Sequence, residues 1–431
     1  MIGKDILKTI ITDNQQRVIP EVWERTLKIP SDSGKIITLA GVRRSGKTYQ
    51  LFNLINQLKA QGVSIEKILY INFEDERLQL SSEELDLILQ AYRELYPQLD
   101  LATCHFFFDE IQEVEGWEKF IARIYSSISQ HIFITGSNAK LLSKEIATAL
   151  RGRTITFEIY PLSFAEFVNI ISSNLNPYSS ADKATLVNLF VRFMHQGGFP
   201  ELVKQADELK DKILQEYFNV MVLRDLIERY QISQATTLKY FCKRIIGASA
   251  GEFSVNKIYN ELKSQGYQIS KDTLYAYQGF VEAIYLNRFI SKYSHSVIKT
   301  ESSQKKTYVI DQGLGAALDY KFSQDNGRLL ETTVALELLK QDKQIAYQQN
   351  GGECDFVVIE KGKVVDAIQA TYDFSDTPTK EREIKGLVSA CQKFGLNKGI
   401  ILSLDHDEEF EVDGIQVSII PVWRYFFNKD R

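Results

Sequence analysis

The sequence has few cysteines and histidines and no long apolar run, which argues against disulfide scaffolds, zinc sites and membrane spans. Its four cysteines are scattered over 431 residues, so they have neither the density of a disulfide framework nor the spacing of metal ligands. The five histidines form no paired motif, which argues against a structural zinc site. No uninterrupted apolar run approaches the ~20 residues that a membrane helix needs. The amino-terminal segment is broken by charges, unlike a signal peptide, and we expect a cytoplasmic protein.

The length and the charge distribution indicate several domains and one basic region. A chain of 431 residues is too long for one ordinary domain, so roughly two to four are expected. Residues 236–310 hold 11 Lys and Arg against 5 Asp and Glu, a local charge of +6 in a chain of net charge −5. A basic island in an acidic chain points to nucleic acid. A solvated basic face explains the same charge equally well.

Residues 35–58 have the pattern of an apolar strand, a glycine-rich turn and an amphipathic helix. The turn at 41–48, GVRRSGKT, fits G-x-x-x-x-G-K-[ST] in full and predicts a phosphate-binding loop, or P-loop. In such a loop Lys47 reaches the β- and γ-phosphates and Thr48 binds Mg²⁺. We therefore expect ATP or GTP to bind with Mg²⁺. The residues expected to contact the nucleotide are Gly41, Arg43, Arg44, Ser45, Gly46, Lys47, Thr48 and Tyr49.

A second strand supplies the acidic residues that such a site needs. The segment 105–112, HFFFDEIQ, is an apolar run that ends in Asp109 and Glu110, as a buried parallel strand does when it ends at a site. Asp109 is expected to hold Mg²⁺, and Glu110 to orient the attacking water as a general base. Two adjacent acids also occur at ordinary strand ends, but together with the P-loop they complete a hydrolytic site.

Two more strands, KILYINFED at 67–75 and HIFITGSN at 131–138, end in polar residues. Polar groups at the carboxyl ends of parallel strands face the nucleotide crevice. With these strands the chain resembles the AAA-type P-loop ATPases, which favours ATP over GTP. The resemblance implies that Ser137 or Asn138 senses the γ-phosphate. It also implies that Asn72 holds Glu110 inactive until a partner binds; a simple strand cap is the alternative for Asn72.

The resemblance further implies arginines that act on the γ-phosphate. Arg151 and Arg153, in ALRGRTITFEIYPLSFAEF, lie where oligomeric ATPases of this kind carry an arginine that reaches a neighbouring subunit. Pairing with surface acids is the alternative for both, and a homo-oligomer is left open. Arg224, in VMVLRDLIERY, is expected to contact nucleotide from a helical lid.

The basic region has the order helix, turn, helix and β-hairpin, which is the winged-helix plan. One helix is expected at 255–264 and a second from Lys271. If the second helix enters a DNA groove, it presents a basic and hydroxyl-bearing face, and the wing presents two lysines. Many winged helices contact only proteins, so a protein partner is the alternative. The residues expected to meet DNA are Lys271, Thr273, Tyr275, Tyr277, Lys305 and Lys306.

From residue 326 the pattern resembles the restriction-endonuclease-like fold, in which a helix Glu, a strand Asp and an E-x-K strand converge on a metal. Glu331 and Asp355 match that arrangement, with Glu353 beside them. Gln369 stands where a ligand carboxylate belongs, and Thr371 replaces the lysine that polarises water. The second metal site expected here therefore consists of Glu331, Asp355 and Gln369. The simpler interpretation, polar ends of a mixed sheet, is favoured over a working nuclease.

Nearly the whole chain resembles a prokaryotic family that joins an AAA-type ATPase to a carboxyl-terminal domain of unknown function. The motifs that carry this resemblance are GVRRSGKT, FFFDEIQEVEGWE, ITGSNAKLLS, LRGRTITFEIYPLSFAEF, GGFPE and LRDLIERY. The expected domains are an α/β P-loop ATPase core (1–160), a helical lid (161–235), a winged helix (236–325) and a restriction-endonuclease-like domain (326–431). The expected function is Mg-ATP hydrolysis that controls binding of nucleic acid or a protein. An ATP-licensed nuclease and a slowly hydrolysing scaffold are the alternatives.

Overall fold

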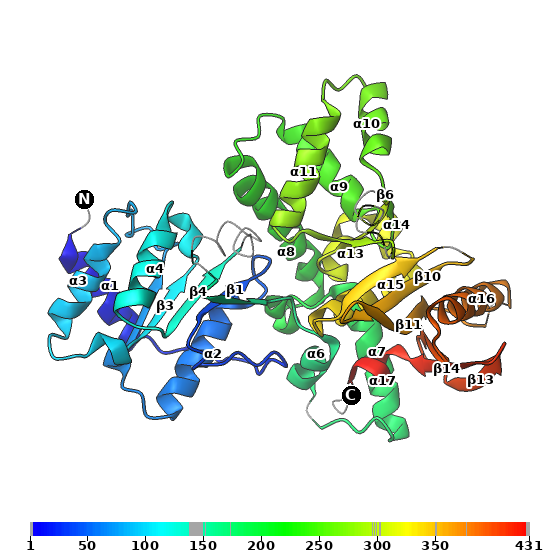
Figure 1. Cartoon of the computed structure of the whole chain (residues 1–431), viewed down its shortest axis with the longest axis horizontal. Coiled ribbons are helices and arrows are strands. Elements are labelled where there is room, and N and C mark those ends of the chain that lie inside the picture. The colour runs from blue at the N-terminus through cyan, green and yellow to red at the C-terminus, as the bar shows by residue number, and fades with distance from the viewer. Residues whose placement is uncertain are drawn as a thin grey trace. The chain divides into compact units, whose positions relative to one another are not determined.

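The computed structural model describes residues 3–137, 150, 152–172, 174–294, 296, 298, 300, 303–349, 351–375 and 377–427. The chain divides into two compact units, Met1–Tyr160 and Pro161–Arg431, and Figure 1 shows the elements of each. Within the described ranges, no helix is both long and apolar enough to cross a membrane.

The first unit is built around a five-stranded parallel sheet of order β2-β3-β4-β1-β5. This arrangement confirms the prediction of an α/β fold with a parallel sheet. Its helices and strands are α1 (Lys4–Gln16), β1 (Ile36–Ala40), α2 (Lys47–Ala60), β2 (Ile68–Asn72), α3 (Asp86–Leu95), β3 (His105–Asp109), α4 (Trp117–Ser127), β4 (Ile132–Gly136) and β5 (Thr154–Glu158).

The inner strands of this sheet are covered on both faces. All five residues of β1, β3 and β4 are buried, as expected for parallel strands between helical layers. In Figure 1, α2 lies on one face of the sheet and α4 on the other. The carboxyl ends of β1, β3 and β4 lie at one edge, where the P-loop follows β1 directly.

The second unit contains two sheets. Its elements are α6 (Phe164–Ile171), α7 (Ser180–Gln196), α8 (Asp207–Val220), the π-helix η6 (Met221–Glu228), α9 (Ala235–Ile246), β6 (Gly251–Phe253), α10 (Val255–Ser264), α11 (Lys271–Ala283), β7 (Asn287–Ser291), β8 (Lys305–Val309), α13 (Gln312–Leu318), α14 (Tyr320–Ser323), α15 (Asn326–Lys340), β9 (Gln344–Gln348), β10 (Cys354–Glu360), β11 (Lys363–Thr371), α16 (Thr377–Phe394), β12 (Lys398–Ser403), β13 (Glu408–Val412), β14 (Ile415–Pro421) and α17 (Val422–Phe427).

The smaller sheet is antiparallel, with the order β6-β8-β7. It accompanies α9, α10 and α11, and serines start two of these helices. Ser254 caps α10 by accepting from the Lys257 amide, and Ser270 caps α11 by accepting from the Thr273 amide. Such caps satisfy amide groups that the first helical turn leaves unpaired.

The larger sheet is mixed, with the order β13-β14-β12-β11-β10-β9. Strands β11, β12 and β14 run parallel to one another, and the remaining neighbours are antiparallel. One apolar cluster joins residues of α15, α17, α6 and α7 to β10, β11 and β12. A second cluster joins α16 to residues of β10, β11, β12 and β14. Apolar residues of two separate clusters thus cover this sheet.

The helices expected to form a separate lid pack differently. Phe164, Phe190 and Phe193, from α6 and α7, lie in the same core as Trp423 of α17 and Phe356 of β10. The segment 161–235 was expected to fold as a domain of its own. Its first two helices instead pack their apolar faces against the carboxyl-terminal sheet. This packing removes the apolar side chains of both helices from water.

The loop between α7 and α8 fits only glycine at its start. A Cβ added at Gly198 would lie 2.3 Å from the Leu162 carbonyl oxygen. The Gly198 amide donates to Oδ2 of the buried Asp311, at 2.7 Å. The loop backbone is therefore held between one carbonyl group and one carboxylate.

We predict that Gly198→Ala lowers the free energy of unfolding by about 1–3 kcal/mol, because the backbone has to move to admit the methyl group. Chemical denaturation of the full chain measures it. Gly279→Ala, in α11, is the control: its added Cβ meets no atom within 4 Å, and alanine stabilises a helix interior by roughly 0.5–1 kcal/mol. Equal stability of wild type and Gly198→Ala would show that this packing is wrong.

Candidate functional site

The P-loop backbone leaves no room for a side chain at its first residue, Gly41. A Cβ at Gly41 would lie 2.2 Å from the Ile159 carbonyl oxygen. Arg44 and Gly46 have left-handed φ values of 63° and 101°, and α2 begins directly after Gly46. A loop of this shape ahead of a helix amino terminus directs amide groups at an anion.

Lys47 is buried and folded back onto the loop. Its Nζ donates to the carbonyl oxygens of Gly41 and Val42, both at 3.3 Å. The same ammonium lies 3.3 Å from Oε1 of Glu110. The structure therefore brings together the lysine and the acid that the sequence predicted at this site.

Asp109 is the centre of a hydroxyl network. Its Oδ2 accepts from Thr48 Oγ1 and from the Tyr70 hydroxyl, both at 2.8 Å. Its Oδ1 accepts from Thr135 Oγ1. Burial and the nearby Glu110 charge raise the pKa of Asp109 above its ordinary value, while the three hydroxyl groups act against this rise. The carboxylate is thus held in place from α2, β2 and β4.

Glu110 has a strained backbone and a paired side chain. Its φ of 51° lies in the left-handed region, which is uncommon for residues other than glycine. Its amide donates to Thr135 Oγ1 at 2.9 Å, and its Oε2 accepts from Gln112 Nε2 at 2.5 Å. Burial alone would raise the pKa of Glu110, but the Lys47 ammonium and the Gln112 amide bring it below its ordinary value. Glu110 is therefore an ionised carboxylate beside Asp109.

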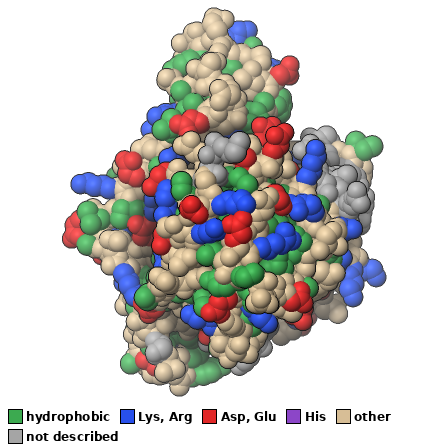
Figure 2. All heavy atoms as spheres, turned by 90° about the vertical axis from the view of Figure 1, so that its left-hand side faces the viewer, with side chains coloured by type: hydrophobic (Ala, Val, Ile, Leu, Met, Phe, Trp, Pro, Cys, Tyr) green, Lys and Arg blue, Asp and Glu red, His purple; other side chains and the backbone are tan. Residues whose placement is uncertain are grey.

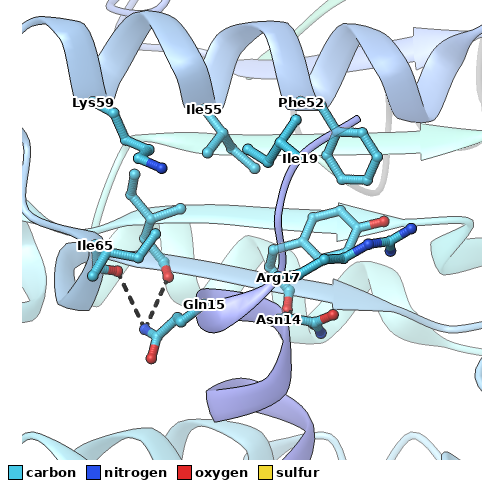
Figure 3. A pocket seen from close by; sticks show the side chains of 10 residues that line it. Asn14, Gln15, Arg17, Ile19, Phe52, Ile55, Lys59 and Ile65 are labelled. Atoms are coloured by element: carbon cyan, nitrogen blue, oxygen red, sulfur yellow. Dashed lines mark hydrogen bonds between the residues drawn. The ribbon is translucent and has the colours of Figure 1, made fainter. Parts of the chain in front are cut away.

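Tyr70 connects Asp109 to a narrow pocket between α2, β2 and the end of α1. Figure 3 shows this pocket, in which Arg17 extends beside Phe52. The Arg17 guanidinium lies 5.4 Å from the Phe52 ring centre, and Tyr70 also lines the pocket. Burial and the Asp109 charge raise the pKa of Tyr70 well above its ordinary value, so its hydroxyl is a donor.

Two buried serine hydroxyls at the site have no hydrogen-bond partner within the described part of the chain. They are Oγ of Ser45, in the P-loop, and Oγ of Ser137, after β4. Buried hydroxyls are almost always hydrogen-bonded. Their orphaned state at this edge of the sheet therefore fits a site that receives a polar ligand.

Arg25 braces the P-loop from the segment before β1. Its guanidinium donates to the Ser45 carbonyl oxygen at 3.2 Å and to the Tyr160 carbonyl oxygen at 2.8 Å. The Ile159 amide donates to the Ala40 carbonyl oxygen at 2.7 Å. The P-loop is therefore fastened to the last residues of the first unit.

The remaining predicted P-loop and strand-end residues are more exposed. Arg43 pairs with Glu74 at 2.7 Å, and the Tyr49 side chain is 47% exposed. Asn72 Oδ1 accepts from the Glu74 amide at 3.0 Å. This is the contact expected if Asn72 only caps the end of its strand.

Of the three arginines predicted outside the P-loop, two fall in the described part of the chain. Arg153 donates to Ser126 Oγ at 2.6 Å, and Arg224 lies in the π-helix of the second unit. Asn138 and Arg151 lie outside the described residues. The roles predicted for all four stay predictions.

Two of the predicted DNA contacts in the basic region are wrong. Tyr277 of α11 is only 4% exposed because its ring packs against Phe241 of α9. Lys306 is only 3% exposed, because carboxylates surround its ammonium. Lys271 and Tyr275 of α11 are exposed. Figure 2 draws the molecule from the left-hand side of Figure 1, where the elements of the first unit are seen, and on that face the described basic and acidic side chains are interspersed rather than gathered into one patch.

Lys306 lies among three carboxylates, which we call the acidic triad. They are Glu331 of α15, Glu353 just before β10, and Asp355 of β10. Its Nζ lies 3.0 Å from Glu331 Oε1, 2.8 Å from Glu353 Oε1 and 3.1 Å from Asp355 Oδ1. Burial disfavours the ammonium, but the neighbouring carboxylates raise the pKa of Lys306 well above its ordinary value. Lys306 is therefore a protonated cation with three acidic partners.

The predicted metal site of Glu331, Asp355 and Gln369 does not form as expected. Gln369 Oε1 accepts from the Asp355 amide at 3.0 Å, and its Nε2 donates to Glu383. The amide group is thus used to position Asp355. Thr371 is buried and bonded to the Asp373 carbonyl oxygen. Among the residues that the structure describes, no group of three or more His, Cys, Asp or Glu is arranged to hold a metal ion.

Sequence reasoning missed Tyr70 and misplaced Lys306. Tyr70 precedes Asn72 by two residues, so strand alternation places both on one side of β2, and that signal was available. Lys306 had no such signal, because its partners lie 25 and 49 residues away in the chain.

Two family models match the chain. The model described as an AAA domain matches residues 33–168. A domain of unknown function (DUF8612) matches residues 187–325. The second match crosses the predicted boundary at residues 235 and 236, so α8, the π-helix η6 and the small sheet fall in one family unit.

Similar proteins cover almost the whole chain. The uncharacterized protein MJ1544 of Methanocaldococcus jannaschii is 37% identical over 99% of this chain and 96% of its own length. An uncharacterized protein of Haemophilus influenzae is 30% identical over 91% of this chain and 94% of its own length. Among solved structures, the Walker-type ATPase PABY2304 of Pyrococcus abyssi matches with a TM-score of 0.40 and 16% identity, over 66% of this chain and 90% of that one. The chain therefore belongs to the family of MJ1544, and it carries an AAA-type P-loop ATPase domain.

Proposed function

We propose that the first unit binds and hydrolyses Mg-ATP. The observation that carries this proposal is the meeting of four side chains at one sheet edge. Lys47 and Thr48 begin α2, Asp109 ends β3, and Glu110 follows it directly. The hydrogen bond from Thr48 to Asp109, at 2.8 Å, joins the hydroxyl and the carboxylate that hold Mg²⁺ in P-loop ATPases.

The residues present fit both the phosphates and the metal. The amides of the P-loop, with Arg44 and Gly46 in left-handed conformations, offer donors to phosphate oxygens. Thr48 and Asp109 offer the oxygen ligands that Mg²⁺ prefers. The unpartnered hydroxyls of Ser45 and Ser137 add donors for a ligand.

Each side chain has a definite role in this proposal. Lys47 turns from the carbonyl oxygens of the loop to the β- and γ-phosphates, and Ser137 contacts the γ-phosphate. Glu110, held ionised by Lys47 and Gln112, accepts hydrogen bonds from the attacking water and orients it. Bound Mg²⁺ supplies neutralisation of the charge that develops on the phosphates. Arg153, together with Arg151, acts on the nucleotide only where a second subunit adjoins.

We further propose that nucleotide state controls binding of a partner by the second unit. The order α9, β6, α10, α11, β7, β8, with a three-stranded antiparallel sheet, supports a winged helix. The order α15, β9, β10, β11, α16, β12 supports a restriction-endonuclease-like domain that no longer cleaves. DNA is the first partner to test, because Lys271 and Tyr275 are exposed on α11; a protein is the alternative.

Two substitutions separate ATP binding from hydrolysis. We predict that Lys47→Ala loses measurable ATP affinity, because the buried cation at the phosphates is removed. We predict that Glu110→Gln still binds ATP but lowers kcat at least about 100-fold, the usual contribution of a general base. Fluorescent ATP binding and phosphate release measure the two effects.

The control for both variants is Lys59→Ala, whose side chain lies at the other end of α2, and which keeps both activities. If Lys47→Ala and Glu110→Gln turn over ATP at the wild-type rate, the proposed function is wrong.

Tyr70 is expected to position Asp109 for the metal. We predict that Tyr70→Phe raises the Mg²⁺ concentration for half-maximal turnover by about threefold to tenfold, because one hydrogen bond to a charged group is lost. Its ATP affinity at saturating Mg²⁺ should match wild type. Tyr96→Phe removes a hydroxyl that bonds Gln15 instead and serves as the control. An unchanged Mg²⁺ requirement in Tyr70→Phe would refute this role.

The DNA hypothesis predicts binding that weakens steeply with salt, because phosphate contacts release counterions. Fluorescence anisotropy of the full chain with duplex DNA, at low and high salt and with and without ATP, measures it. Lys271→Ala should weaken binding and reduce the salt slope by about one. Lys212→Ala, an exposed lysine on α8, should leave both unchanged. No binding at low salt would leave a protein as the partner.

A further inference from the structure

The acidic triad of the second unit surrounds a cation that belongs to the chain itself. Lys306 comes from β8 of the small sheet, while the triad comes from α15 and the start of β10. An ammonium group has three N–H donors, and each is within 3.1 Å of one carboxylate oxygen. Buried lysines occur almost only when they are paired in this way.

Three carboxylate oxygens that converge on one point are also what a divalent cation binds. Mg²⁺ and Mn²⁺ prefer such oxygen ligands, at metal–oxygen distances of about 2.1 Å. The oxygens here lie 2.8–3.1 Å from Nζ, the spacing of hydrogen bonds to nitrogen. The triad is therefore spaced for an ammonium and not for a metal, and each oxygen would have to move inward by about 0.7–1 Å to reach a metal–oxygen distance.

The carboxylates are held in place by groups other than Lys306. The Tyr308 hydroxyl donates to Glu331 Oε1 at 2.8 Å. The Ala370 amide donates to Asp355 Oδ2 at 3.1 Å, and Gln369 accepts from the Asp355 amide. These contacts remain when the lysine is shortened or neutralised. The third carboxylate, Glu353, is half exposed and leaves an approach from solvent.

We propose that Lys306 is a tethered cation that fills a divalent-cation site, so that its ammonium excludes a metal ion from the acidic triad. The lysine also ties β8 to α15 and β10, and thus the small sheet to the large one. While Lys306 is in place, the triad holds no metal for phosphodiester hydrolysis. Removal of the ammonium leaves the triad without the cation that it surrounds and opens the site to Mg²⁺ or Mn²⁺.

The test is Mn²⁺ binding to the full chain without nucleotide, measured by isothermal titration calorimetry. Lys306→Met should gain one Mn²⁺ site per chain, at least tenfold tighter than any Mn²⁺ binding by wild type. Lys305→Met, which removes the neighbouring lysine of β8, should titrate like wild type. Adding Asp355→Asn to Lys306→Met should abolish the gained site.

Thermal unfolding gives a second readout. Lys306→Met without metal should unfold at a lower temperature than wild type, because its triad is uncompensated. MnCl₂ should raise that midpoint, while KCl of the same ionic strength should not. A variant that folds only in Mn²⁺ supports the proposal equally.

Two results would overturn it. One is a folded Lys306→Met that gains no Mn²⁺ site. The other is a wild-type Mn²⁺ site that Asp355→Asn removes. If Lys306→Met stays unfolded with and without Mn²⁺, the comparison of wild type with Asp355→Asn decides: equal titrations support the proposal, and a site lost in Asp355→Asn refutes it. None of these measurements depends on ATP turnover, so the proposed function can fail independently.

Discussion

The burial of one carboxylate, Asp109, organises the first unit. A buried acid is costly unless hydrogen bonds replace its water, and hydroxyls of Thr48, Tyr70 and Thr135 do this from three different elements. Each donor fixes its own element relative to β3. These contacts offset the cost of burying the Asp109 carboxylate. They therefore also fix α2, β2 and β4 at the spacing that the site requires.

The second unit also buries a charged side chain, in this case a cation. Lys306 is buried, and its desolvation is offset by the acidic triad. A buried ion cluster adds little net stability compared with well-packed apolar residues, but losing one member is costly. Such a cluster therefore determines which segments pack together, and it contributes less to the stability of their packing. In this chain it specifies that β8 packs beside α15 and β10.

The sequence predicted the features that local order determines. The P-loop shape follows from Gly41 and Gly46, the strand ends follow from apolar runs, and α10 and α11 follow from the helix–turn–helix pattern. It could not predict side chains that meet across long separations. Lys306 was predicted to be a wing lysine because the local sequence of its strand does not reveal its distant partner Glu331. The helices α6 and α7 were predicted to form a lid because the sequence of an apolar helix face does not reveal which surface it packs against.

The close approach of Gly41 to Ile159 has a mechanical consequence. The phosphate-binding loop and the peptide that leaves the first unit share an anchor made of Arg25, the Ile159 amide and the carbonyl oxygens that these groups contact. With no side chain at Gly41 to act as a spacer, the two backbones touch. The position of the phosphate-binding loop and the position of the backbone at Ile159 and Tyr160 therefore depend on each other.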